Sequence, residues 1–203
     1  MAEEKVLINS SDLEIEGFLE NLQGNKAVLV THPHPLYGGN MHNNVVIALV
    51  KAYRKNGYST LRINFRGVDG SQGVHDNGIG EQEDIRASLA YLSDLGKDEI
   101  DLVGYSFGAW VTALGLISFD QADRIIMISP PVSFLDFSLL SYTPKIKLVI
   151  TGSHDEFASS EKIEDMLLSW NPEAVFRIIP GADHFFWGKD EEIMAKISDF
   201  LEK

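Results

Sequence analysis

The sequence of 203 residues contains no cysteine. A disulfide framework and a thiol nucleophile are therefore excluded, and so is any reaction mechanism that depends on a cysteine. This absence leaves the redox state of the compartment open.

Long apolar runs are also lacking. The first five residues, Met-Ala-Glu-Glu-Lys, are mostly charged, and no later stretch is long and apolar enough for a signal sequence or a membrane span. We therefore expect a cytoplasmic protein that has no membrane partner.

Positive charge is scarce. The chain has 17 Lys and Arg against 30 Asp and Glu, which gives a net charge of −13 at pH 7. Such a surface repels nucleic acid and anionic lipid, so neither is expected as a partner. A solvated acidic surface, as on many soluble proteins, is enough to explain the charge, so the charge identifies no substrate. We expect a small-molecule substrate, and a chain that acts as a monomer or a homodimer.

The arrangement of apolar residues predicts one α/β domain over residues 1–203. Strand patterns alternate with helical patterns, which is typical of a mostly parallel twisted sheet with helices on both faces. Residues 5–9 and 13–19 are expected to form an antiparallel hairpin at the sheet edge. Further strands are predicted at 27–31, 58–65, 99–105, 124–129, 145–151 and 174–180, and helices near 40–55, 80–95, behind residue 106, 159–170 and 190–202. Only residues 130–144 separate two of these strands, too few for a lid domain.

The most informative motif is Gly-x-Ser-x-Gly at residues 104–108, which follows a strand pattern and leads directly into a helical pattern. This context is typical of a nucleophile elbow, in which a serine stands on a strained strand-to-helix turn. The glycines are needed there because a side chain would clash with the neighbouring strand or helix. Ser106 is therefore the candidate nucleophile.

A serine nucleophile needs a histidine base and an acid that orients it, and in this architecture they follow in the order Ser, Asp or Glu, His. Asp155 lies just past the strand at 145–151, and His184 lies in the loop after the strand at 174–180. They are the candidate acid and base. Asp183 is the alternative acid, and His154 is better explained as a turn or rim residue.

An oxyanion hole requires backbone N–H donors. The N–H of Phe107, directly after the nucleophile, is one candidate. The loop after the strand at 27–31 should supply the other, and since its prolines have no N–H, His34 is preferred over Leu36 and Tyr37.

With these motifs, the chain resembles an α/β-hydrolase. Residues 32–44, His-Pro-His-Pro-Leu-Tyr-Gly-Gly-Asn-Met-His-Asn-Asn, resemble the signature of small, lidless, mostly uncharacterised members of that superfamily. Residues 64–73 resemble their Asn-Phe-Arg-Gly-x-Gly-x-Ser-x-Gly loop, with Asp69 preceding the matching glycine. The resemblance implies a Ser-Asp-His hydrolase that acts on an ester, a thioester or a related acyl bond.

The substrate pocket is predicted from apolar side chains near these motifs. The segment 130–144 is unusually apolar for a loop, and aromatic residues follow His184. Packing against the body of the protein or at a dimer contact is the open alternative. The expected pocket residues are Leu36, Tyr37, Tyr105, Phe134, Phe137 and Phe185.

No metal and no cofactor are expected. The His-x-His alternation at residues 32–34 lacks the spacing of a metal site, and residues 67–73 lack the lysine of a phosphate-binding loop. The predicted activity is that of a carboxylesterase-like serine hydrolase that works through an acyl-enzyme. A non-catalytic binding scaffold, an acyltransferase and a peptidase are the alternatives.

Overall fold

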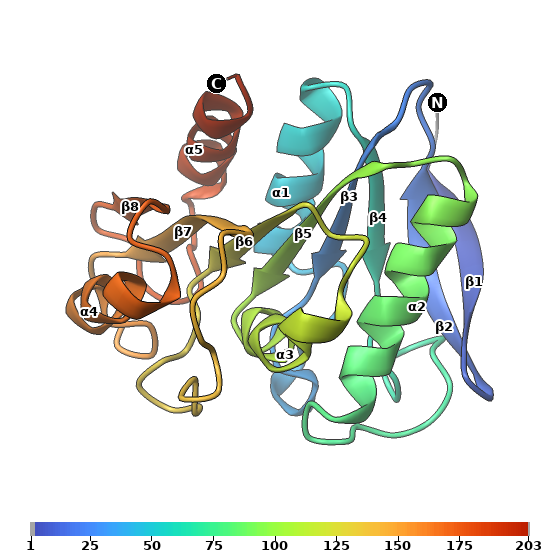
Figure 1. Cartoon of the computed structure of the whole chain (residues 1–203), viewed down its shortest axis with the longest axis horizontal. Helices are drawn as coiled ribbons and strands as arrows, with labels where there is room; N and C mark the ends of the chain where they lie inside the picture. Colours follow the sequence, from blue (N-terminus) through green and yellow to red (C-terminus); the bar gives the residue numbers. More distant parts are fainter. Residues whose placement is uncertain (1–2, 203) are drawn as a thin grey trace.

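The computed structural model describes residues 3–202. Within them, eight strands form one sheet in the order β1-β2-β4-β3-β5-β6-β7-β8 (Figure 1). The strands are β1 (Glu4–Ser10), β2 (Leu13–Glu20), β3 (Lys26–Thr31), β4 (Ser59–Ile63), β5 (Glu99–Tyr105), β6 (Arg124–Ile128), β7 (Ile146–Gly152) and β8 (Val175–Ile179).

The N-terminal strands run antiparallel and the rest of the sheet is parallel. β1 pairs with β2, and β2 pairs with β4, both antiparallel. β4, β3, β5, β6, β7 and β8 pair in parallel. The predicted hairpin and the predicted mostly parallel sheet are confirmed.

Helices cover both faces of the sheet, as predicted. They are α1 (Asn44–Lys55), α2 (Gly80–Asp94), α3 (Phe107–Gly115), α4 (Ser160–Trp170) and α5 (Asp190–Leu201). α1 and α5 pack on one face and α2, α3 and α4 on the other (Figure 1). Side chains alternate along a strand, so Val28 and Val30 of β3 enter the core beneath α1 and α5, while Leu29 enters the opposite core. No helix in residues 3–202 is both long and apolar enough to span a membrane.

One helix begins later than the sequence predicts. The prediction places its start near residue 40, but α1 begins at Asn44. Asn43 caps the helix, because its side chain accepts a hydrogen bond from the N–H of Val45 at 2.9 Å. The prediction missed this start because Asn40 and Asn43 are both good N-cap residues.

The carboxyl ends of the parallel strands carry the loops that hold the candidate site. β3 leads into a loop with a short 3-10 turn at Pro35–Tyr37, and β5 leads into α3. The segment 130–144 between β6 and β7 contains no helix or strand, so the expected absence of a lid domain is confirmed.

Candidate active site

Ser106 occupies the sharp turn between β5 and α3. Its φ of 53° and ψ of −113° lie in a region that residues other than glycine rarely adopt. The turn is held in place because the N–H of Ser106 donates to the carbonyl of Ile128 on the adjacent strand, at 2.9 Å. The strained conformation is therefore supported by the sheet itself.

The two glycines of the motif are required by close backbone contacts. A Cβ on Gly104 would lie 2.6 Å from the Cα and N atoms of Ala109 in α3. A Cβ on Gly108 would lie 2.4 Å from the hydroxyl of Thr31 and 3.0 Å from the carbonyl oxygen of His32. The glycines thus let α3 approach β5 and let the loop after β3 cross the start of α3.

Replacing Gly104 with alanine is expected to lower the free energy of unfolding by about 3 kcal/mol or more, because the new methyl group meets backbone atoms that cannot rotate away. Urea denaturation followed by circular dichroism measures the loss. Gly57→Ala is the control: its φ is +81° and nothing lies within 4 Å of the added Cβ. That variant should lose only about 1 kcal/mol. Equal losses in the two variants would contradict the close approach of α3.

His184 is in contact with the candidate nucleophile. Its Nε2 atom lies 2.8 Å from the Oγ atom of Ser106. Its backbone carbonyl accepts a hydrogen bond from the hydroxyl of Tyr105 at 2.8 Å, so Tyr105 ties the loop of His184 to the end of β5. His184 is 7% exposed, so a small part of the residue is accessible from solvent.

Asp155 completes the chain of contacts. Both of its carboxylate oxygens lie 2.9 Å from the Nδ1 atom of His184. One of them also accepts hydrogen bonds from the N–H groups of Phe157 at 3.0 Å and Ala158 at 2.8 Å. An acceptor at Nδ1 selects the tautomer that carries its proton there, so Nε2 is left to accept the hydroxyl proton of Ser106.

The carboxyl group of Asp155 is held in its ionised form. Burial by itself raises its pKa. The hydrogen bond and the charge of His184, with a further hydrogen bond from the N–H of Ala158, outweigh burial and lower the pKa of Asp155 below its ordinary value. The carboxylate therefore carries its full charge at neutral pH.

The alternative residues from the sequence lie elsewhere. The carboxylate of Asp183 accepts the N–H groups of Phe185 and Phe186, both at 3.0 Å, and so closes its own loop. His154 is exposed, and its backbone N–H donates to the carbonyl of Ala182 at 2.9 Å. Neither side chain contacts the imidazole of His184 among the hydrogen bonds of residues 3–202.

The candidate oxyanion donors are two backbone N–H groups. Phe107 is the first residue of α3, so its N–H has no partner inside the helix. In the loop after β3, the N–H of Leu36 donates to the Nδ1 atom of His34 at 3.3 Å and that of Tyr37 to the carbonyl of His34 at 3.1 Å. Within residues 3–202, no acceptor is found for the N–H of His34 or of Phe107. Their role in an oxyanion hole stays a prediction.

Phe157 and Phe185 lie beside the imidazole of His184, and Phe134 extends this group of rings. The ring centroid of Phe157 lies 4.8 Å from that of His184, and the ring centroid of Phe185 lies 5.7 Å from it. Phe134 stacks on Phe157 at 4.6 Å. Phe134 and Phe185 are exposed, so this aromatic cluster of Phe134, Phe157 and Phe185 forms an open wall beside the base. Phe157 was not predicted, although its position two residues after the candidate acid is a signal that could have found it.

Two predicted pocket residues are buried away from any pocket surface. Phe137 is 3% exposed and packs against Trp170 at 5.5 Å, so it belongs to the core beneath α4. Tyr105 is 1% exposed and uses its hydroxyl to hold His184. A side chain with almost no accessible surface cannot contact a substrate, so neither residue can line a substrate pocket.

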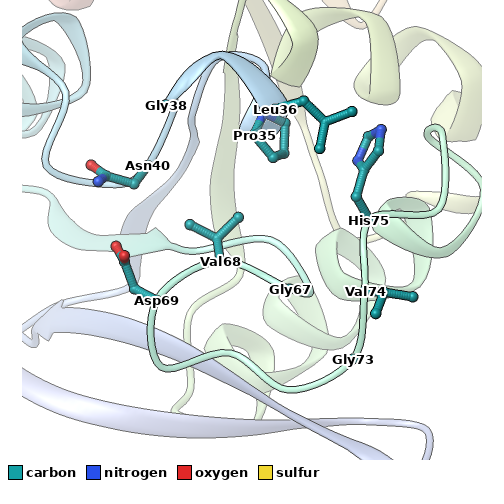
Figure 2. Close-up of a pocket in the computed structure, with 11 residues that line it drawn as sticks. Pro35, Leu36, Gly38, Asn40, Gly67, Val68, Asp69, Gly73, Val74 and His75 are labelled. Carbon is teal, nitrogen blue, oxygen red and sulfur yellow. The ribbon is translucent and has the colours of Figure 1, made fainter.

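A separate pocket of about 390 Å³ lies between the loop after β3 and the loop at residues 67–75 (Figure 2). Leu36 and His75 stand at one end, and Asn40 and Asp69 at the other (Figure 2). Tyr37, 88% exposed, is not among its lining residues. The lining residues do not include the candidate nucleophile, base or acid. The pocket adjoins the site through His75, whose ring lies 5.2 Å from that of His34 and 5.4 Å from that of Phe107.

His32 is a buried histidine with both ring nitrogens in contact with the backbone. Its Nε2 atom accepts the N–H of Phe65 at 3.0 Å, and its Nδ1 atom lies 2.6 Å from the carbonyl oxygen of Pro33. Burial lowers the pKa of His32 to about 4, against an ordinary value of about 6.5. The folded protein thus holds a neutral imidazole here.

This depressed pKa predicts a loss of stability in mild acid. Between pH 6.5 and about pH 4, His32 is protonated in the unfolded chain but neutral in the folded chain. The free energy of unfolding is therefore expected to fall by about 3 kcal/mol as the pH falls from 6.5 to 4. Urea denaturation at pH 7 and pH 4 should show that the difference in stability between the wild type and His32→Gln shrinks in acid. The same difference at both pH values would refute this expectation.

Across the described part of the chain, residues 3–202, no group of three or more His, Asp or Glu side chains is arranged to hold a metal ion.

The sheet order and the serine at the strand-to-helix turn define an α/β-hydrolase, here one without a lid domain. Solved structures agree. An α/β serine hydrolase homologue from Coxiella burnetii is 33% identical, with a TM-score of 0.90 over 98% of this chain and 97% of that chain. A putative α/β hydrolase from Agrobacterium tumefaciens is 31% identical, with a TM-score of 0.90 over 98% and 95% of the two chains. The chain therefore belongs to the α/β-hydrolase superfamily.

Two further comparisons refine this placement. A serine hydrolase without a lid from Xanthomonas campestris is 28% identical, with a TM-score of 0.89 over 100% of this chain and 94% of that chain. An uncharacterised protein of Rickettsia prowazekii, RP471, is 38% identical over 209 residues, which cover 97% of this chain and 88% of that protein. No family model matches the chain.

Proposed function

We propose that this α/β-hydrolase is a serine esterase or thioesterase that cleaves small to medium acyl substrates through Ser106, His184 and Asp155. One observation carries the proposal: the hydroxyl of Ser106 lies 2.8 Å from Nε2 of His184, whose Nδ1 lies 2.9 Å from both oxygens of Asp155. A nucleophile in contact with a base, itself oriented by an acid, is the arrangement that acyl transfer requires.

The reaction proceeds in two halves. Oγ of Ser106 attacks the acyl carbonyl carbon while Nε2 of His184 takes its proton, and the imidazolium is stabilised by the carboxylate of Asp155. The oxygen of the tetrahedral intermediate accepts hydrogen bonds from the N–H groups of Phe107 and His34. The intermediate expels the alcohol or thiol, which takes the proton from His184. Water then attacks the acyl-enzyme with His184 as the base, and the acid product and free Ser106 are released.

The surroundings favour an apolar group on the substrate. The aromatic cluster of Phe134, Phe157 and Phe185 offers exposed ring surface beside His184. No folded lid covers it, because the segment 130–144 contains no helix or strand. Such a site suits short aliphatic or aromatic groups that reach it from solvent, and Leu36 at the edge of the neighbouring pocket adds apolar surface on the other side.

A panel of chromogenic substrates tests the proposal. We expect hydrolysis of p-nitrophenyl acetate and butyrate and of a matched thioester, with little turnover of the corresponding p-nitroanilide and no turnover by Ser106→Ala. Faster cleavage of the anilide than of the ester would favour a peptidase instead. Transfer of the acyl group to added alcohols or amines in place of water would favour an acyltransferase. Binding of these compounds without any turnover would favour a non-catalytic scaffold.

A further inference from the structure

The peptide unit that joins Pro33 to His34 is held from several sides. It carries the carbonyl of Pro33 and the N–H of His34, the proposed second oxyanion donor. Residues 3–202 contain no cis peptide bond, so the carbonyl and the N–H of this planar unit point in opposite directions. Any group that fixes the direction of the Pro33 carbonyl therefore also fixes the direction of the His34 N–H.

His32 is the group that fixes this carbonyl. Its Nε2 atom is occupied as an acceptor by the N–H of Phe65 at 3.0 Å, so the neutral ring carries its proton on Nδ1. That N–H donates to the carbonyl oxygen of Pro33 at 2.6 Å. The ring cannot turn away, because it is fully buried and packs edge-on against the ring of Phe65 at 4.8 Å.

Gly39 packs closely against the same carbonyl. A Cβ at this position would lie 2.2 Å from the carbonyl oxygen of Pro33 and 2.7 Å from that of His34. The N–H of Gly39 donates to the carbonyl of His34 at 3.1 Å, which anchors the next peptide as well. The N–H of His34 thus lies between two anchored carbonyls, and within residues 3–202 it has no acceptor of its own.

We infer that His32 is a positioning residue of the oxyanion hole: its Nδ1–H bond to the Pro33 carbonyl turns the His34 N–H toward the oxygen of the reacting carbonyl. This inference rests on the proposed function. A flip of this peptide needs only ψ of Pro33 and φ of His34 to change. The proline ring fixes φ of Pro33 and therefore does not prevent the flip. Without the bond to His32, the unit can rotate and the donor is lost in the transition state, although the substrate still binds.

Two substitutions of His32 separate positioning from packing. His32→Gln supplies an acceptor for the Phe65 N–H and a donor for the Pro33 carbonyl, whereas His32→Leu supplies neither. With p-nitrophenyl butyrate, we expect His32→Leu to lower kcat by about 10²- to 10³-fold, the usual cost of one lost oxyanion donor. KM should remain within about threefold, because the lost bond acts only in the transition state. His32→Gln should recover at least about a tenth of the wild-type kcat.

A second readout reports on the oxyanion directly. A trifluoromethyl ketone adds to the nucleophile as a charged tetrahedral adduct, so its inhibition constant should rise about in proportion to the fall in kcat. The pH dependence of kcat/KM should not change, because the substitution leaves the candidate base and acid in place. Gly39→Ala places a methyl group against the Pro33 carbonyl oxygen and is predicted to give the same pattern, so it serves if His32→Leu does not fold.

Several results would overturn the inference. They are an unchanged kcat in a folded His32→Leu, equal losses in the Gln and Leu variants, and a fall in kcat with no change in trifluoromethyl ketone inhibition. If His32→Leu does not fold, a folded Gly39→Ala with normal kcat overturns it too. Failure of the proposed function itself is seen separately and first, as a wild-type protein that hydrolyses none of the esters.

Discussion

Substitution of Ser106 by alanine is expected to lower kcat/KM for p-nitrophenyl butyrate by about 10⁴- to 10⁶-fold, the range found when a triad nucleophile is removed. The side chain of Ser106 makes one hydrogen bond, to Nε2 of His184, and the turn itself is held by the backbone bond to Ile128. The fold should therefore survive the change, which circular dichroism checks.

An exposed serine provides the matched control. The hydroxyl of Ser169 on α4 bonds only to the carbonyl of Met166 in its own helix. Ser169→Ala should keep the wild-type rate. If Ser106→Ala kept more than about a tenth of the wild-type rate, another group would have to be the nucleophile.

Substitution of Asp155 by asparagine should lower kcat by about 10⁴-fold through the tautomer of His184. The carboxylate oxygen that accepts the N–H groups of Phe157 and Ala158 is expected to be retained as the amide oxygen. The amide NH₂ then takes the other position and donates to Nδ1 of His184. The ring proton is driven onto Nε2, which can no longer accept the proton of Ser106.

The control for this prediction is Asp183→Asn, because Asp183 directly precedes the base in sequence and is the alternative acid. Its hydrogen bonds close the local loop and do not reach the imidazole. We expect less than about a tenfold loss in kcat for it. A greater loss in Asp183→Asn than in Asp155→Asn would reverse the assignment of the acid.

Local signals made much of the fold predictable. β5 has the bounds expected from its apolar run, and the hairpin of β1 and β2 follows from the alternation of residues on either side of a short polar turn. The sharp turn at Ser106 was expected because glycine stands on both sides of it, and contacts at Gly104 and Gly108 give the physical reason. The start of α1 was misjudged because asparagine caps occur at more than one suitable position.

The environment of the site was harder to predict, because it depends on which loops meet in space. The composition of the segment 130–144 gives no means of telling Phe134, which is exposed and stacks on Phe157, from Phe137, which packs on Trp170. The hydrogen bonds of His32 were not predicted either. One of its hydrogen bonds is to Phe65, 33 positions away, and the other is to the adjacent Pro33. No sequence motif indicates this pair of bonds.

The most direct test of the central claim is the intact mass of the wild-type protein and of Ser106→Ala after exposure to a fluorophosphonate, which reacts with serines activated by a base. The account predicts one adduct on the wild type, none on Ser106→Ala, and strongly reduced labelling of Asp155→Asn. A folded wild-type protein that stays unlabelled, with a smaller reagent of the same class as well, would contradict the claim that Ser106, His184 and Asp155 form a working catalytic triad.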